Sequence, residues 1–233
     1  MKTWFTGPEK QVSLGDKLVS SADAIVSYEL ITSSSPDGNE SRFLQFDAPL
    51  SLIIQASRYN QSTADSSHRI KQLYIAQSDI RSLPPALAED LPVPMLVREA
   101  GKGDIYSSSI WLGLQPTYTP LHRDPNPNVF CQLAGSKAVR LLRPRAGMAV
   151  FQDVRRRLGS SGSSSRLRGS EMMDGPEREG LHRAVWVDPP ESEIWQAVLD
   201  PGDALFIPQG WWHSVRSVGR EAELNASANW WFR

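Results

Sequence analysis

The stretch TPLHRDPNPNVFCQLAGSKAVRLLRP, residues 119–144, contains two apolar runs that a Gly-Ser pair separates. The runs NVFCQLAG (128–135) and AVRLLRP (138–144) are rich in Val, Leu and Phe and end at Gly or Pro, which predicts two β-strands joined by a turn. Comparable runs occur elsewhere in the chain, at 71–77, 109–114, 204–208, 213–218 and 225–232. Many short strands between turn residues predict a mainly β fold, a sandwich or a barrel.

The first part of the chain has a different texture. FDAPLSLIIQASRYN (46–60) has apolar residues at helical spacing after an Asp-Ala-Pro start, which predicts a helix. Polar stretches rich in Ser, Pro, Gly and Asn predict loops at 33–41 and 61–68. We therefore expect a mixed helical and loop region over 1–70 that packs on a β domain over 71–233.

One stretch within the β domain does not have the composition of a core. RRRLGSSGSSSRLRGSEMMDGPEREG (155–180) is rich in Ser, Gly and Arg and poor in apolar residues, which predicts a long, mobile, solvated insertion. The alternative is a basic arm that contacts an acidic partner, a nucleic acid or a phosphorylating enzyme.

The overall composition is that of a globular protein. Of 233 residues, 40% are hydrophobic and 22% charged, and the formal net charge of -1 gives no electrostatic reason to expect a nucleic-acid surface or a membrane partner. The single cysteine, Cys131, excludes an intrachain disulfide and a four-cysteine zinc site. The sequence has no signal-peptide pattern and no apolar run of roughly 20 residues, so we expect the cytoplasm, the nucleus or both.

Three residues predict a metal site. His122 and Asp124 are two positions apart, so in an extended chain their side chains project from the same face. His213, in DPGDALFIPQGWWHSV (200–215), offers a third ligand. Two histidines and one carboxylate form the facial triad typical of non-haem Fe(II), which leaves coordination positions open. His68 and His182 lie in polar, loop-like surroundings and are expected at the surface.

Lys137 follows the Gly-Ser turn and precedes Ala138 and Val139. A lysine at the start of an apolar strand can point inward and pair with a buried carboxylate, or it can be a solvated residue at the strand end. Its spacing alone favours the solvated position.

Several of these segments together resemble the JmjC family of Fe(II)- and 2-oxoglutarate-dependent oxygenases, particularly its small, cupin-like hydroxylase-type members. The resemblance rests on LYIAQ (73–77), IWLG (110–113), the stretch 119–144, PGDALFIPQGWWHSV (201–215) and NASANWWF (225–232). It covers 71–233 apart from the insertion. Residues 1–70 match no part of the pattern, and no zinc-binding cysteine cluster or chromatin-reading module is present in the sequence.

The resemblance implies a double-stranded β-helix, or jelly roll, with helical N-terminal elements. It implies that His122, Asp124 and His213 hold Fe(II) and form the catalytic centre. It also implies contacts to 2-oxoglutarate from Tyr74, Thr119, Asn128, Lys137 and Asn229, and pocket walls formed by Trp111 and Trp231.

The implied activity is hydroxylation of a protein or peptide side chain, with release of succinate and CO2. The absence of reader modules favours it over a histone or other protein lysine or arginine demethylase. Another alternative is an RNA-modifying hydroxylase that uses the Arg155–Arg168 region for phosphate contacts. A non-catalytic JmjC-like scaffold is the last alternative, and the intact ligand set argues against it.

Overall fold

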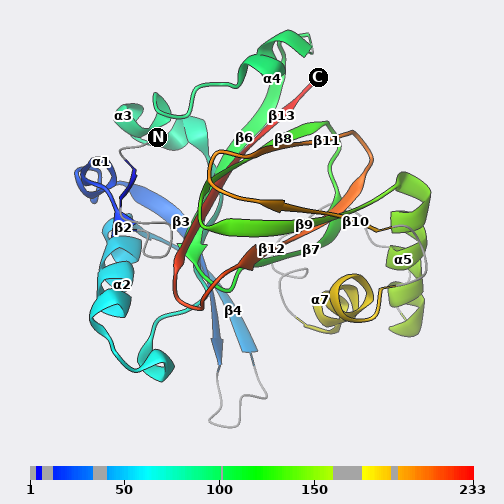
Figure 1. Ribbon diagram of the computed structural model, residues 1–233, viewed down its shortest axis with the longest axis horizontal. Coiled ribbons are helices and arrows are strands. Elements are labelled where there is room, and N and C mark those ends of the chain that lie inside the picture. Colours follow the sequence, from blue (N-terminus) through cyan, green and yellow to red (C-terminus); the bar gives the residue numbers. More distant parts are fainter. Residues whose placement is uncertain (1–3, 7–12, 34–40, 101, 160–174, 190–193) are drawn as a thin grey trace.

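Two antiparallel sheets face each other and enclose the centre of the molecule (Figure 1). The computed structural model describes residues 4–6, 13–33, 41–100, 102–159, 175–189 and 194–233. The larger sheet has seven strands in the order β11-β8-β13-β6-β5-β3-β4, and the smaller has four in the order β10-β9-β12-β7. This arrangement confirms the predicted mainly β jelly roll.

The strands of the larger sheet are β11 (Ala204–Ile207), β8 (Asn128–Ala134), β13 (Leu224–Phe232), β6 (Ile105–Leu114), β5 (Leu73–Asp79), β3 (Ile25–Ser33) and β4 (Ser41–Pro49). The strands of the smaller sheet are β10 (Trp195–Leu199), β9 (Ser136–Leu142), β12 (Trp212–Val218) and β7 (Tyr118–Arg123). A separate pair, β1 (Phe5–Thr6) and β2 (Ser13–Leu14), lies near the N-terminus.

Helices cover the outer face of each sheet, as Figure 1 shows. The larger sheet is covered by α1 (Asp16–Val19), α2 (Ser51–Ser62), α3 (Pro85–Ala88) and α4 (Met95–Ala100), with the short 3-10 helices η1 (Ser66–His68) and η2 (Ile80–Ser82) between them. The smaller sheet is covered by α5 (Pro144–Arg157), α7 (Gly175–His182) and the π-helical η3 (Arg183–Val187). Apolar side chains between helices and sheets form the two largest cores. A third, smaller apolar cluster joins strands of the two sheets and includes Phe130, Leu141 and Val215.

α5 packs closely on the smaller sheet through a glycine. A Cβ atom at Gly147 would lie only 2.1 Å from the ring of Trp212. The glycine therefore lets the helix approach the fully buried tryptophan, which lies next to His213 in β12.

The predicted helix over 46–60 is wrong in its first part. Residues 46–49 belong to β4, and α2 begins at Ser51. Phe46 and Ala48 alternate along the strand and pack against the core, a period of two that the helical pattern further along obscured. Residues 1–70 also contribute β3, which pairs with β5 on the other side of the boundary expected at residue 70. The division of the chain at residue 70 stays a prediction.

The predicted insertion over 155–180 is wrong at both ends. Arg155 and the two following arginines form the last turn of α5, and residues 175–180 lie in α7. Arg156 and Arg157 lie on the exposed side of the amphipathic helix α5, whereas Arg155 is buried and pairs with Glu177 at 2.9 Å. The centre of the prediction, 160–174, lies outside the described residues.

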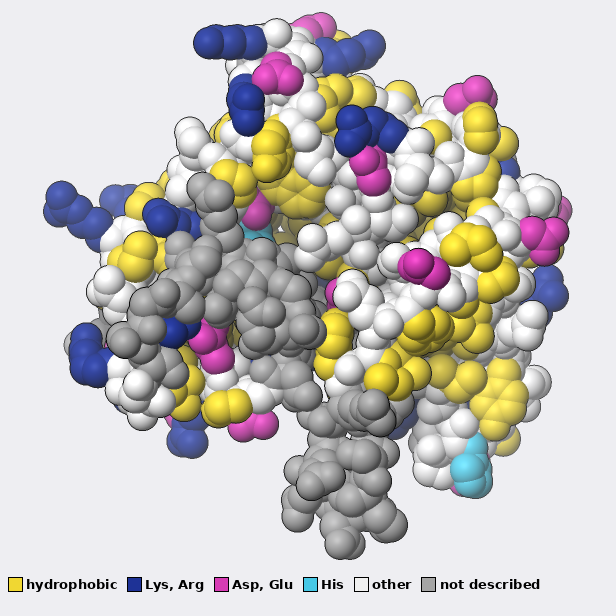
Figure 2. Space-filling view, turned by 180° about the vertical axis from the view of Figure 1, so that it is seen from behind, with side chains coloured by type: hydrophobic (Ala, Val, Ile, Leu, Met, Phe, Trp, Pro, Cys, Tyr) yellow, Lys and Arg dark blue, Asp and Glu magenta, His cyan; other side chains and the backbone are white. Residues whose placement is uncertain are grey.

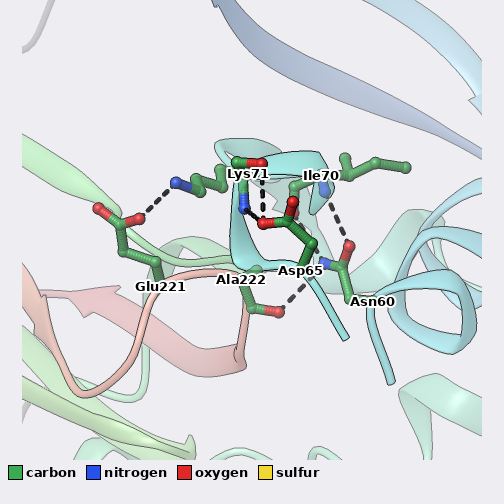
Figure 3. Close-up of polar contacts among 7 residues, drawn as sticks. Asn60, Asp65, Ile70, Lys71, Glu221 and Ala222 are labelled. Atoms are coloured by element: carbon green, nitrogen blue, oxygen red, sulfur yellow. Dashed lines mark hydrogen bonds and ion pairs between the residues drawn. The ribbon is translucent and has the colours of Figure 1, made fainter. Parts of the chain in front are cut away.

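A side-chain clamp joins the end of α2 to the loop between β12 and β13 (Figure 3). The buried Asn60 amide donates to Ile70 O at 2.7 Å and to Ala222 O at 3.2 Å, and its Oδ1 accepts from Ile70 N at 2.8 Å. Lys71 and Glu221 form an ion pair beside it, with 2.5 Å between Nζ and Oε2. The clamp holds the chain at the start of β5, which carries Tyr74 into the space between the sheets.

The described helices include none with the length and apolar content that crossing a membrane requires. The expected location in the cytoplasm or nucleus stays a prediction.

Candidate metal centre

His122, Asp124 and His213 meet at one end of the space between the sheets. His122 lies in β7 directly opposite His213 in β12, and Asp124 follows the end of β7. Asp124 Oδ1 is 3.7 Å from His122 Nε2, and Asp124 Oδ2 is 3.6 Å from His213 Nε2. In the part of the chain that the structure describes, this is the one group of three such residues whose ligand atoms are close enough for a single metal ion, all within 4.8 Å of one another.

A bulge in β7 aims two of the predicted residues at the same cavity. Thr119 pairs with Val215 and His122 pairs with His213, so two residues of β7 stand opposite Ser214 alone. Without the bulge, residues three apart would project from opposite faces of the sheet. With it, Thr119 and His122 both line the cavity.

Hydrogen bonding and burial set the protonation of the ligands. His122 Nδ1 lies 2.8 Å from Pro120 O, and a bond donated to that carbonyl leaves Nε2 as the acceptor for a metal. Burial and the neighbouring His122 lower the pKa of His213 to about 4. Burial opposes ionisation of Asp124, but the two histidines and hydrogen bonds from Trp231 and Asn128 hold its pKa below the usual value. A neutral imidazole and an ionised carboxylate are the forms that bind a divalent cation.

Side chains behind Asp124 fix its orientation. Trp231 Nε1 donates to Asp124 Oδ2 at 2.7 Å, and Asn128 Nδ2 donates to the same oxygen at 3.1 Å. Asn229 Nδ2 donates in turn to Asn128 Oδ1 at 2.9 Å. Oδ2 is thereby occupied, which leaves Oδ1 for a metal. The resemblance gives Asn128 and Asn229 contacts to 2-oxoglutarate, and that role stays a prediction.

Lys137 is buried, so a solvated position at the strand end is excluded. Its side chain is in the same cavity as the metal ligands, and the residue is 2% exposed. Nζ donates to Ser227 Oγ at 2.7 Å and to Tyr74 Oη at 3.2 Å. No ion pair joins it to a carboxylate of the described residues, and burial lowers its pKa to about 7. An unpaired cation buried in a cavity is suited to bind an anion.

Tyr74 reaches Lys137 because Gly113 lies beside it. A Cβ atom at Gly113 would lie 2.3 Å from the Tyr74 ring. Burial, and then the charge of Glu29, raise the pKa of Tyr74, so its hydroxyl is neutral and can donate to an anion. Sequence reasoning missed Ser227, although it lies two positions before Asn229 in β13 and so shares its face.

The cavity has a volume of about 300 Å³ and contains all ten predicted site residues. It is lined by Tyr74, Gln77, Tyr106, Ser107, Ser109, Trp111, Thr119, His122, Arg123, Asp124, Pro125, Asn128, Phe130, Lys137, His213, Val215, Asn229 and Trp231. The structure thus brings the predicted residues together, while the role of each stays a prediction. The other two histidines lie outside it: His68 is exposed, and His182 is half-buried with its ring edge-on to Tyr118.

Known proteins support the resemblance. The sequence model of the cupin-like domain family matches residues 8–233. Jumonji C domain-containing protein 5 of Drosophila melanogaster is 31% identical over 161 residues, which cover 68% of this chain and 36% of the relative. Lysine-specific demethylase 8 of Danio rerio is 30% identical over 161 residues, which cover 68% of this chain and 36% of the relative. JmjC domain-containing protein F of Dictyostelium discoideum is 27% identical over 193 residues, which cover 77% of this chain and 39% of the relative.

The matched part spans less than two fifths of the length of each of these relatives. In this chain, the match to the family model extends across both sheets and includes the residues that line the cavity. The chain belongs to the cupin-like domain family and, within it, to the JmjC-domain proteins.

Proposed function

We propose that the chain is an Fe(II)- and 2-oxoglutarate-dependent oxygenase that hydroxylates a protein or peptide side chain and releases succinate and CO2. The observation that supports it best is the combination of two features in one cavity. One end has two histidines and a carboxylate within 4.8 Å of one another, and the cavity also contains Lys137, buried and with no carboxylate partner among the described residues. A metal site alone fits many cupins, whereas the buried cation fits a cosubstrate with a second carboxylate.

The described residues fit both groups. His122, Asp124 and His213 would hold Fe(II). Lys137 faces Ser217 in β12 and His213 faces Leu141, so four residues of strand, about 13 Å, separate the backbone positions of the cation and the ligand. Side chains from both positions extend into this gap. Bound together, Fe(II) and 2-oxoglutarate would supply the oxidation, in which one oxygen atom of O2 enters succinate and the other becomes the product hydroxyl.

The chain's own residues position and shield these groups. Lys137 would pair with the distal carboxylate of 2-oxoglutarate, with Tyr74 and Thr119 donating hydroxyl hydrogen bonds. Trp231 would hold Asp124 in its binding orientation. Phe130, whose ring centroid lies 5.5 Å from Lys137 Nζ, would keep water from the carboxylate pair.

Demethylation of a protein is the second candidate, because a relative is named a lysine-specific demethylase. The lining supports hydroxylation of an uncharged side chain instead. Asp124 is the one carboxylate among the described lining residues, and Arg123 adds a positive charge to that lining. A methylated, cationic side chain would find no free carboxylate there. Formaldehyde release would identify demethylation.

The structure gives the RNA alternative no support. Arg155 pairs with Glu177, and Arg156 and Arg157 both pair with Asp153. Each of these described arginines thus has a carboxylate partner within the protein, and Arg156 and Arg157 share one. On the face shown in Figure 2, basic and acidic side chains are interspersed.

The test measures succinate formed from 2-oxoglutarate with Fe(II) and a peptide library. Products are then searched by mass spectrometry for a mass gain of one oxygen atom. We expect succinate from the wild type and from the matched control His68→Ala, whose histidine is exposed, and none from His122→Ala. If the protein binds Fe(II) but forms no succinate with any of the peptides or with cellular RNA, only the non-catalytic scaffold alternative remains.

A further inference from the structure

Two arginines share one tryptophan on the outer face of the smaller sheet. Arg140 Cζ lies 4.7 Å from the centroid of the Trp186 ring, and Arg216 Cζ lies 4.3 Å from it. Arg140 is in β9 opposite Ser214, and Arg216 is two residues further along β12. Lys137 and His213 point to the cavity between the sheets, so these arginines lie on the opposite side of the same strands.

The two guanidinium groups differ in their hydrogen bonds. Arg140 is held in place, since it donates to Gln196 Oε1 at 2.9 Å and to Val185 O. Arg216 is exposed and makes no hydrogen bond or ion pair with the residues that the structure describes. Its five N–H donors are therefore available to a ligand.

The local charge is unbalanced. Burial and the charge of Arg216 lower the pKa of Arg140, and burial with the charges of Arg178 and Arg216 lowers the pKa of His182. Contacts with the Trp186 ring offset this repulsion in part. No carboxylate among the described residues pairs with Arg140 or Arg216.

The neighbouring helices show a different pattern. Arg155 pairs with Glu177, Arg157 with Asp153, and Arg183 with Asp188. These three arginines thus each have a carboxylate partner, whereas neither Arg140 nor Arg216 has one among the described residues. A nucleic acid presents phosphates at regular intervals and needs a longer basic track. A single dianion matches two adjacent guanidinium groups, which bind phosphate through paired N–H donors.

We propose that Arg140 and Arg216 form a binding site for one phosphate dianion, either inorganic phosphate or a phosphomonoester. The site is separate from the proposed oxygenase centre and does not depend on it. Trp186 supports both guanidinium groups, and its own Nε1 is fixed by a bond to Ser214 Oγ at 2.9 Å.

The test is a calorimetric titration of the full, EDTA-treated chain at constant ionic strength. The probes are inorganic phosphate, glycerol 1-phosphate and a twelve-nucleotide oligouridylate. We expect inorganic phosphate and glycerol 1-phosphate to bind saturably. Their affinity should fall at least about 10-fold in Arg216→Gln. The matched control is Arg156→Gln, which also removes one exposed positive charge and should leave the affinity unchanged.

Arg216→Lys keeps the positive charge but lacks the planar guanidinium, so we expect its affinity for phosphate to lie between those of the wild type and Arg216→Gln. A thermal melt of each variant shows that it is folded. Absence of saturable phosphate binding would overturn the proposal, as would equal losses in Arg216→Gln and Arg156→Gln. Oligouridylate binding that is tighter than phosphate binding and depends on Arg216 would replace it with a nucleic-acid site.

Discussion

Replacing Lys137 by methionine is expected to stabilise the ligand-free protein and to abolish its affinity for 2-oxoglutarate. Burial lowers the pKa of this lysine from 10.5 to about 7. At about 1.36 kcal/mol per pKa unit, holding the charged lysine in the fold costs roughly 5 kcal/mol. Methionine has a similar length and no charge, but it leaves Tyr74 and Ser227 without their donor, at about 1 kcal/mol each. The net gain is about 3 kcal/mol at pH 6.

The gain depends on pH in a defined direction. Because the folded pKa lies below the unfolded one, the unfolded chain binds more protons between about pH 7 and 10.5, and the wild type becomes more stable as pH rises. The cost of the buried charge falls from about 5 kcal/mol at pH 6 to about 2 kcal/mol at pH 9. The two proteins should therefore have similar stability at pH 9.

The assays are urea denaturation of the EDTA-treated protein at pH 6 and 9 and calorimetric titration with 2-oxoglutarate. Loss of a buried charge pair should weaken binding at least about 100-fold. The control is Lys102→Met, at an exposed lysine, which should change neither quantity. If Lys137→Met is no more stable than the wild type at pH 6 and binds 2-oxoglutarate within about threefold of the wild-type affinity, Lys137 is not a buried cation that pairs with the cosubstrate.

Three further predictions concern the cosubstrate, the metal and the stability of the fold. The affinity for 2-oxoglutarate should fall as pH rises above about 7, by up to about tenfold per pH unit, because only the charged lysine pairs with a carboxylate. The variant Lys137→Arg stays charged, so its affinity for 2-oxoglutarate should change little with pH. A wild-type affinity that calorimetry finds constant from pH 6 to 9 would contradict this. Trp231→Phe removes the bond to Asp124 and should weaken metal binding about 10-fold in a chelator competition, and an equal affinity would reject this support. Asn60→Ala removes three hydrogen bonds and should lower the free energy of unfolding by about 2–3 kcal/mol in urea, whereas a loss below about 0.5 kcal/mol would exclude the clamp.

The parts of the site that sequence predicted follow from strand alternation. His122 and Asp124 are two apart and converge at one end of the cavity. In β13 the same rule sends Asn229 and Trp231 inward and Trp230 outward into the core. This rule is local, so it can be applied before any strand partner is known.

The remaining features depend on contacts between distant segments. Thr119 shares the cavity with His122 because β7 bulges opposite Ser214, and pairing with β12 creates that bulge. The bond from Trp231 to Asp124 joins residues 107 positions apart. β4 was obscured because its strand pattern runs into the start of α2, and its nine-residue pairing with β3 decided the outcome.

We propose that one cavity holds both groups, the metal on His122, Asp124 and His213 and 2-oxoglutarate on Lys137. A crystal structure of the chain grown without oxygen, with Mn(II) and 2-oxoglutarate, tests it most directly. We expect a metal about 2.0–2.3 Å from His122 Nε2, His213 Nε2 and Asp124 Oδ1, with the distal carboxylate on Lys137 Nζ. A metal bound elsewhere, or 2-oxoglutarate bound away from Lys137, would contradict it.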